Sequence, residues 1–187
     1  PGLRALHAAG RVDLVPLQYR AIYDWLEREV PVDIALLQVA APDAQDRCAF
    51  GLRVDFAPAV LAKARLVVAE INAALPVLPG CPTLPIAAID YAVAVDRPPG
   101  TEPPAAIDAT ARAIGAEIAR WIRDGDCLQV GVGSIPDAAL AALAEHNDLG
   151  VHSGMIAHGI AALARRGVIT GARKRADRGR IVTGFVT

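Results

Sequence analysis

Residues 126–146 constrain the fold more than any other stretch, because they join a short apolar run, a glycine-bearing turn and a helix start. Cys127–Val130 predicts a strand, and Pro136 suits the first helical position, where its missing N–H costs nothing. Gly131 and Gly133 fall in the turn, where a ligand can approach the backbone without a side chain in the way. We expect a concave backbone pocket that can hold a phosphate, a carboxylate or a thioester oxygen. A tight turn that serves only the fold is the alternative interpretation.

The rest of the chain alternates strand-like apolar runs with segments of helical periodicity. Strands are predicted at 11–17, 32–40, 65–71, 86–95, 149–154 and 180–187, and helices at 19–29, 57–64, 105–123 and 155–166. The run 32–40 is apolar almost throughout, as is typical of a parallel strand covered on both faces. The alternation predicts an α/β fold with a mostly parallel sheet and flanking helices. The longest helix should bury one stripe of isoleucines, at Ile107, Ile114, Ile118 and Ile122.

The composition agrees with one aliphatic α/β domain. The 187 residues are 53% hydrophobic but only 4% aromatic, so the core must be aliphatic and rich in alanine. This length suits one ordinary domain, residues 1–187, with the proline-rich stretch 96–104 as an internal crossover. A net charge of −1 gives no electrostatic footprint for nucleic acid or a membrane surface. No apolar run is long enough to span a bilayer, so we expect neither nucleic acid nor membrane as a partner.

Cysteine and histidine usage excludes further classes of protein. Cys48, Cys81 and Cys127 are odd in number, far apart, and share no metal-ligand spacing with the four histidines. This pattern predicts reduced thiols in a cytosolic protein that has no metal site. No signal-peptide pattern opens the sequence, so we expect a cytoplasmic location.

Polar residues at strand ends are the remaining candidates for chemistry. His152 and Ser153 end a strand one βα unit after the glycine turn, so a parallel sheet would bring them to the same edge; a packing role remains open for His152. No nucleophile-elbow pattern surrounds Ser134 or Ser153, which argues against a serine hydrolase. The Gly-x-Gly-x-x-Pro turn lacks the third glycine of a dinucleotide site. Asp55 ends another strand-like stretch, where a helix N-cap is the favoured interpretation over a functional acid.

Two motifs and a series of shorter blocks carry a resemblance to a known family. The motifs are Leu-Gln-Val-Gly-Val-Gly-Ser-Ile-Pro-Asp at 128–137 and Gly-Val-His-Ser-Gly-Met at 150–155. Further blocks lie at 31–39, 42–43, 51–55, 64–72, 89–91, 146–149, 167–170 and 179–182. Together they resemble the amino-terminal half of the acetyl-CoA hydrolase/transferase family, which includes 4-hydroxybutyrate and related acyl-CoA:carboxylate CoA-transferases.

The resemblance implies a CoA-transferase-type α/β domain of an enzyme that moves CoA between an acyl-CoA thioester and a small carboxylate or water. In that family a glutamate attacks the acyl-CoA, giving an acyl-glutamyl anhydride and then a glutamyl-CoA thioester. CoA is then a substrate, and no cofactor is implied. The resemblance assigns substrate or CoA binding to the turn and the strand end, at Gln129, Gly131, Gly133, Ser134, Ile135, Pro136, His152, Ser153 and Met155.

The resemblance also implies that the nucleophilic glutamate lies beyond Thr187, in a carboxyl-terminal half. Glu70, Glu117 and Glu145 do not match it, and Gly154 stands where many members carry Glu. The sequence stops inside an apolar run, so we expect that half to be missing and this chain alone to be inactive. We also expect homo-oligomers. The alternative is a non-catalytic α/β domain, or a decayed remnant, that binds CoA or a carboxylate.

Overall fold

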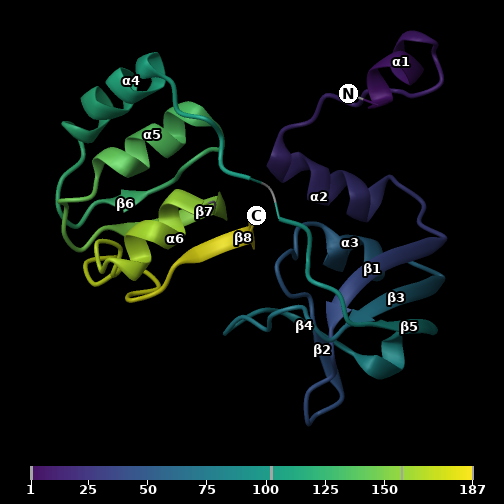
Figure 1. Ribbon diagram of the computed structural model, residues 1–187. Helices are drawn as coiled ribbons and strands as arrows, with labels where there is room; N and C mark the ends of the chain where they lie inside the picture. The colour runs from purple at the N-terminus through teal and green to yellow at the C-terminus, as the bar shows by residue number, and fades with distance from the viewer. Residues whose placement is uncertain (1, 102, 157, 187) are drawn as a thin grey trace.

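The computed structural model describes residues 2–101, 103–156 and 158–186. In chain order the elements are α1 (Gly2–Ala8), α2 (Tyr19–Arg28), β1 (Ile34–Ala40), β2 (Arg47–Ala49), α3 (Ala57–Leu61), β3 (Leu66–Asn72), β4 (Thr83–Pro85), the 3₁₀ turn η1 (Ile86–Ala88), β5 (Tyr91–Val95), α4 (Ala109–Ala119), β6 (Cys127–Leu128), α5 (Ser134–Ala142), β7 (Gly150–Ile156), α6 (His158–Arg165) and β8 (Val182–Val186). Figure 1 shows two groups of elements, on either side of the extended connection from β5 to α4.

Two three-stranded parallel sheets form the framework. The first sheet has the order β1-β3-β5, with Leu36 opposite Val68 and Val68 opposite Tyr91. The second sheet has the order β6-β7-β8, with β7 in the centre. A short antiparallel pair, β2 with β4, accompanies the first sheet. The α/β class with mostly parallel strands and flanking helices is therefore confirmed, although the strands divide between two sheets.

Each sheet has its own apolar core. Helices α5 and α6 pack on one face of β7, where the least exposed residues are Leu143, Leu149, Val151 and Ile160. Helix α3 and strand β2 pack on one face of the first sheet, around Val39, Cys48 and Ala69. Burial raises the pKa of the Cys48 thiol. Within the described ranges, no helix is both long and apolar enough to cross a bilayer.

The opposite face of the first sheet is open. Ile34 and Leu36 of β1 are 52% and 78% exposed, and Tyr91 and Val93 of β5 are 63% and 57% exposed. Side chains alternate along a strand, so the pairing register puts these four residues on one face. Parallel sheets are normally covered on both faces. This surface, called the open face below, is therefore available for further packing.

The predicted strand at 11–17 is wrong. Residues 11–17 form neither strand nor helix, and Leu14 is 74% exposed. An apolar segment becomes a strand only by pairing, the described part of the chain gives it no neighbour, and Pro16 has no N–H to donate. The segment instead joins the unpredicted helix α1 to α2, which begins at Tyr19 as expected.

Helix α4 buries its smallest residues and leaves both of its isoleucines exposed, contrary to the prediction for Ile114 and Ile118. The other two predicted isoleucines, Ile107 and Ile122, lie outside α4, and Ile122 packs against the core of the second sheet. Ala111, Gly115 and Ala119 are buried, whereas Ile114 and Ile118 are 39% and 38% exposed. A Cβ on Gly115 would lie 2.5 Å from the backbone carbonyl carbon of Ala138, so α4 and α5 are in backbone contact. Only small residues fit between helices at this separation, which turns the isoleucines outward.

The last strand joins the two groups of elements. The Val186 N–H donates to the Leu52 carbonyl at 2.9 Å, and the Val54 N–H donates to the Gly184 carbonyl at 3.4 Å. The Arg53 guanidinium lies 5.3 Å from the centre of the Phe185 ring. These contacts between residues 52–54 and 184–186, called the seam below, hold β8 against the segment between β2 and α3.

Candidate substrate site

The turn after β6 contains its two glycines for two different reasons. Gly133 has φ 123° and ψ 177°, a conformation that is essentially restricted to glycine. Gly131 meets no such demand, and the nearest atom to a Cβ there would be Pro136 Cγ at 4.0 Å. The space over Gly131 is therefore open because the residue is small. Gln129, which precedes the turn, is exposed beside it.

Helix α5 begins two residues earlier than predicted. Its first residue is Ser134, so Pro136 lies within the first turn, where N–H groups have no partner inside the helix in any case. No side-chain cap forms at this end in the described structure, which leaves the N–H groups of Ser134 and Ile135 available to a ligand oxygen. The negative charge of Asp137, in the same turn, interacts favourably with the helix dipole but repels an anionic ligand. This end therefore suits a neutral thioester oxygen better than a phosphate.

Ser153 holds the turn in place. Its Oγ donates to the Val130 carbonyl at 2.9 Å and accepts from the Val130 N–H at 3.1 Å, and the residue is 4% exposed. Strand β6 ends at Leu128, so these two hydrogen bonds replace the strand ladder across to β7. Ser153 is therefore a positioning residue, and its contact with substrate stays a prediction.

The predicted residues divide between the two faces of β7. Ser153 lies on the buried face, and Met155, half-buried and opposite Phe185 of β8, follows it two residues later. His152 is exposed on the other face, where it lines a cavity of about 450 Å³. The sheet thus brings Ser153 to the turn and separates His152 from it, although the two residues were expected to act at one edge.

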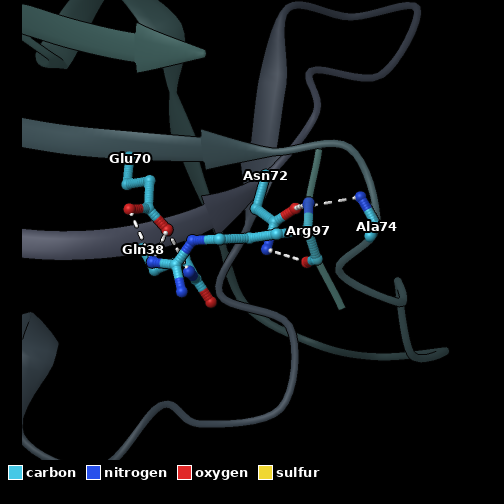
Figure 2. Close-up of polar contacts among 5 residues, drawn as sticks. All are labelled: Gln38, Glu70, Asn72, Ala74 and Arg97. Carbon is cyan, nitrogen blue, oxygen red and sulfur yellow. Dashed lines mark hydrogen bonds and ion pairs between the residues drawn. The ribbon is translucent and has the colours of Figure 1, made fainter. Parts of the chain in front are cut away.

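A polar cluster that the sequence analysis did not single out lies at the carboxyl end of the first sheet (Figure 2). Arg97 Nη2 lies 2.8 Å from both carboxylate oxygens of Glu70, and the Gln38 amide donates to Glu70 Oε1. The Arg97 guanidinium, and after it the Gln38 amide, hold the pKa of Glu70 below its usual range. Glu70 is therefore a fixed anion. The available signal was a polar residue inside each of two otherwise apolar strands.

Asn72 fixes the chain that leaves β5. The side chain is fully buried, and its Nδ2 donates to the Arg97 carbonyl at 2.9 Å. Its Oδ1 accepts from the N–H groups of Ala74 at 3.1 Å and Arg97 at 3.3 Å (Figure 2). One amide thus sets both the turn after β3 and the start of the connection to α4, and this places Arg97 beside Glu70.

A cavity of about 430 Å³ opens at the carboxyl end of β1, next to the seam. Its lining includes Gln38, Arg53, Asp55 and Val186, so apolar walls are combined with one cation and one carboxylate, as in many small-molecule sites. Within the described ranges, His, Cys, Asp and Glu side chains form no group of three or more that could hold a metal ion.

The N-cap interpretation of Asp55 is wrong. Helix α3 has Phe56 at its N-cap, and Asp55 has φ 40°, outside the extended region that a capping residue adopts. The Asp55 carboxylate instead accepts from the Tyr19 hydroxyl at 2.6 Å and lies 3.8 Å from Arg53 Nε. This hydrogen bond, and after it burial, raises the pKa of Tyr19 to about 12. Asp55 therefore ties α2 to the wall of the cavity.

The sequence from residue 2 to residue 100 matches the acetyl-CoA hydrolase/transferase N-terminal domain. The chain belongs to this family. Similarity to individual members extends over the second sheet as well. The 4-hydroxybutyrate coenzyme A transferase of Clostridium kluyveri is 36% identical over 179 residues, which cover 95% of this chain and 42% of that protein. The succinyl-CoA:acetate/propanoyl-CoA:succinate CoA transferase of Fasciola hepatica is 34% identical over 179 residues, 95% of this chain and 37% of that protein.

Similarity to solved structures confirms the CoA-transferase-type fold. The 4-hydroxybutyrate CoA-transferase of Porphyromonas gingivalis matches with a TM-score of 0.86 at 32% identity, over 98% of this chain and 47% of that one. RipA from Yersinia pestis matches with a TM-score of 0.89 at 30% identity, over 99% of this chain and 44% of that one. The chain thus spans less than half the length of each of these relatives.

Proposed function

We propose that this chain is the amino-terminal domain of an acyl-CoA hydrolase or CoA-transferase, which moves CoA between an acyl-CoA thioester and a small carboxylate or water. The observation that carries the proposal is the similarity over 95% of the chain to two proteins named as CoA transferases. A cytoplasmic location and assembly into homo-oligomers belong to the proposal and rest on the sequence alone.

The turn after β6 supplies one wall of the proposed active site. The thioester carbonyl approaches over Gly131, and the N–H groups of Ser134 and Ile135 donate to its oxygen. Donors held in place by a helix end stabilise the negative charge that develops on this oxygen when the carbonyl carbon is attacked. Ser153 keeps the donors in position through its two hydrogen bonds to Val130.

The attacking glutamate is placed outside this chain. Its carboxylate oxygen bonds to the acyl carbon and the CoA thiolate leaves; the thiolate then attacks the glutamyl carbonyl and releases the acyl group as a carboxylate. The acceptor, a carboxylate or water, completes the turnover. Glu70 and Glu117 are paired with arginines at 2.8 and 3.2 Å, and Glu145 is 94% exposed beside Arg166, which is consistent with none of these three being the nucleophile.

The alternative function is binding of CoA or a carboxylate without catalysis. One departure from the family pattern that the resemblance implies, Gly154 in place of Glu, favours it. A Cβ on Gly154 would meet no atom within 4 Å. The position therefore has room for a carboxylate side chain that this chain does not provide.

An activity assay of the isolated chain tests whether the nucleophile lies outside it. Incubated with acetyl-CoA and a carboxylate, the chain should release no thiol and exchange no acyl group above background, as followed by thiol titration and mass spectrometry. Robust turnover by the purified chain would contradict a nucleophile outside it.

The complete gene product distinguishes the two functions. If the proposed function is right, the unmodified complete gene product exchanges acyl groups and needs no Gly154→Glu substitution for this activity. An inactive wild type that gains transfer through Gly154→Glu would instead support the binding function. A matched Gly154→Gln variant fills the same space without a carboxylate, so it separates the effect of the charge from the effect of packing.

A further inference from the structure

The cavity of about 450 Å³ beside His152 is lined by a basic segment that the proposed function does not use. Arg173, Lys174 and Arg175 form one side of it, and Asp126 and Cys127 at the start of β6 form another. The volume lies within the range of small-molecule sites. The cavity is on the exposed face of β7, away from the Ser153 face that holds the glycine turn.

Two of the cationic side chains pack directly over glycines. A Cβ on Gly125 would lie 2.5 Å from Arg173 Cδ, and a Cβ on Gly150 would lie 2.6 Å from Lys174 Cγ. Both side-chain stems therefore lie flat against the backbone at the start of β6 and β7, and any larger residue at either position would displace them. This packing restricts the positions of the two cationic side chains in the cavity wall, whereas a lysine on an open surface rotates freely.

Lys174 is the unusual member of this wall. It is 6% exposed, and its Nζ donates to the carbonyls of Val151 at 3.0 Å and Arg180 at 2.8 Å. An ammonium has three donors, so one remains beyond these two bonds. A buried ammonium without a carboxylate is costly, and in the described structure no ion pair is formed by Lys174. An anion in the cavity would supply the missing charge.

The residues that line the cavity carry a net positive charge, although Asp148 and Asp124 outside the lining offset Arg173. Arg173 Nε is paired with Asp148 at 3.3 Å, and the Asp126 carboxylate accepts from the Arg123 N–H at 2.8 Å. Asp126 is the carboxylate among the lining residues, so it offsets one cation. Lys174 and the exposed Arg175 remain without a carboxylate partner among the described residues.

We propose that this cavity binds a phosphate group, as a phosphomonoester or a diphosphate. The Arg175 guanidinium presents a planar fork that matches phosphate oxygens, and Lys174 supplies a fixed point charge. Two sources share this chemistry: the nucleotide end of CoA, and a free phosphorylated metabolite. The site does not depend on the proposed transfer reaction, because a phosphate contains no thioester.

Titration calorimetry of the 187-residue chain with pyrophosphate tests the proposed phosphate site. We expect saturable binding at one site that weakens as salt is raised. Arg175→Ala should weaken binding at least about tenfold, because it removes the charged fork. Arg178→Ala is the matched control: it removes the same charge from the same exposed loop at a residue outside the cavity lining. Its effect should stay below about twofold, the size expected from a distant screened charge.

Competition identifies the source of the phosphate. CoA should displace pyrophosphate if the nucleotide end occupies the cavity, and pantetheine, which has no phosphate, should not. Displacement by neither, with pyrophosphate still bound, assigns the site to a free phosphorylated metabolite. Two results would overturn the proposal: no saturable pyrophosphate binding, or equal weakening by Arg175→Ala and Arg178→Ala. Either result stands apart from acyl exchange by the complete gene product, so failure of this site and failure of the proposed function are distinguishable.

Discussion

At the scale of single residues, the two glycines of the turn serve different purposes: Gly131 leaves open space, and Gly133 adopts a backbone conformation that other residues avoid. Gly131→Val adds a side chain over the turn without a backbone penalty, because Gly131 has ordinary φ and open space around a Cβ. In the complete gene product we expect kcat/KM to fall at least about tenfold, or about 1.4 kcal/mol of transition-state stabilisation, with the melting temperature nearly unchanged.

Gly133→Val serves as the contrasting variant, since its φ of 123° makes any side chain strained. It should lower the melting temperature, whatever it does to activity. Undiminished kcat/KM in folded Gly131→Val would show that the glycines serve only the turn.

The ion pair at Glu70 predicts a pH dependence. Arg97 and Gln38 hold the pKa of Glu70 below its ordinary value of 4.5, so this stabilisation is present above that value and is lost as pH falls through the folded-state pKa. Glu70→Gln should therefore lower the melting temperature at neutral pH, and this difference should shrink as pH falls through the folded-state pKa of Glu70. Glu117→Gln breaks a pair whose side chains are 68% and 74% exposed and should have little effect across this pH range. A Glu70→Gln effect that is independent of pH would contradict the assignment.

At the scale of elements, the contact between α4 and α5 predicts the sign of one substitution. Gly→Ala in a helix interior normally stabilises by about 0.5–1 kcal/mol. Gly115→Ala should instead destabilise, because its Cβ would lie 2.5 Å from backbone atoms of α5 that cannot move aside separately. Chemical denaturation of the chain measures this sign. A more stable Gly115→Ala variant would show that the two helices separate easily.

The same element shows where prediction from sequence succeeds and where it stops. Apolar runs such as 32–40 predicted β1 because a buried parallel strand has few other ways to satisfy its backbone. The prediction that α4 buries its isoleucines was wrong because periodicity identifies an apolar face but not the element that packs against it. Helix α5 approaches α4 so closely that glycine and alanine fill the interface. The 11–17 segment failed for a related reason, since strand pairing is a property of two segments.

The candidate site divides in the same way. The glycine turn and the helix after it could be predicted because turn and cap chemistry is local. The two bonds between Ser153 and Val130 depend on how β6 ends beside β7, and the Glu70–Arg97 pair depends on Asn72 holding a distant backbone segment. Neither follows from spacing along the chain.

At the scale of the whole molecule, the open face predicts association. Leu36 projects from it at 78% exposure, and an uncovered face of a parallel sheet favours contact with other apolar surfaces. We expect the isolated chain to self-associate in light scattering, and co-expression with the rest of the gene product to relieve this. Leu36→Lys should reduce self-association, whereas Leu14→Lys, at a residue that is 74% exposed outside the sheet, should not. A monodisperse monomer would count against the prediction.

The seam also has a consequence for how the chain is made. Each sheet is built from neighbouring segments, but the Leu52 carbonyl and the Val54 N–H are paired with β8, about 130 residues later in the sequence. During synthesis these groups wait unpaired while the second sheet emerges, and contacts so distant in sequence form slowly. In that interval β8 of one copy can occupy the seam of another, because the exchanged strand makes the same hydrogen bonds. We therefore expect the seam to be the place where crowded nascent chains exchange strands.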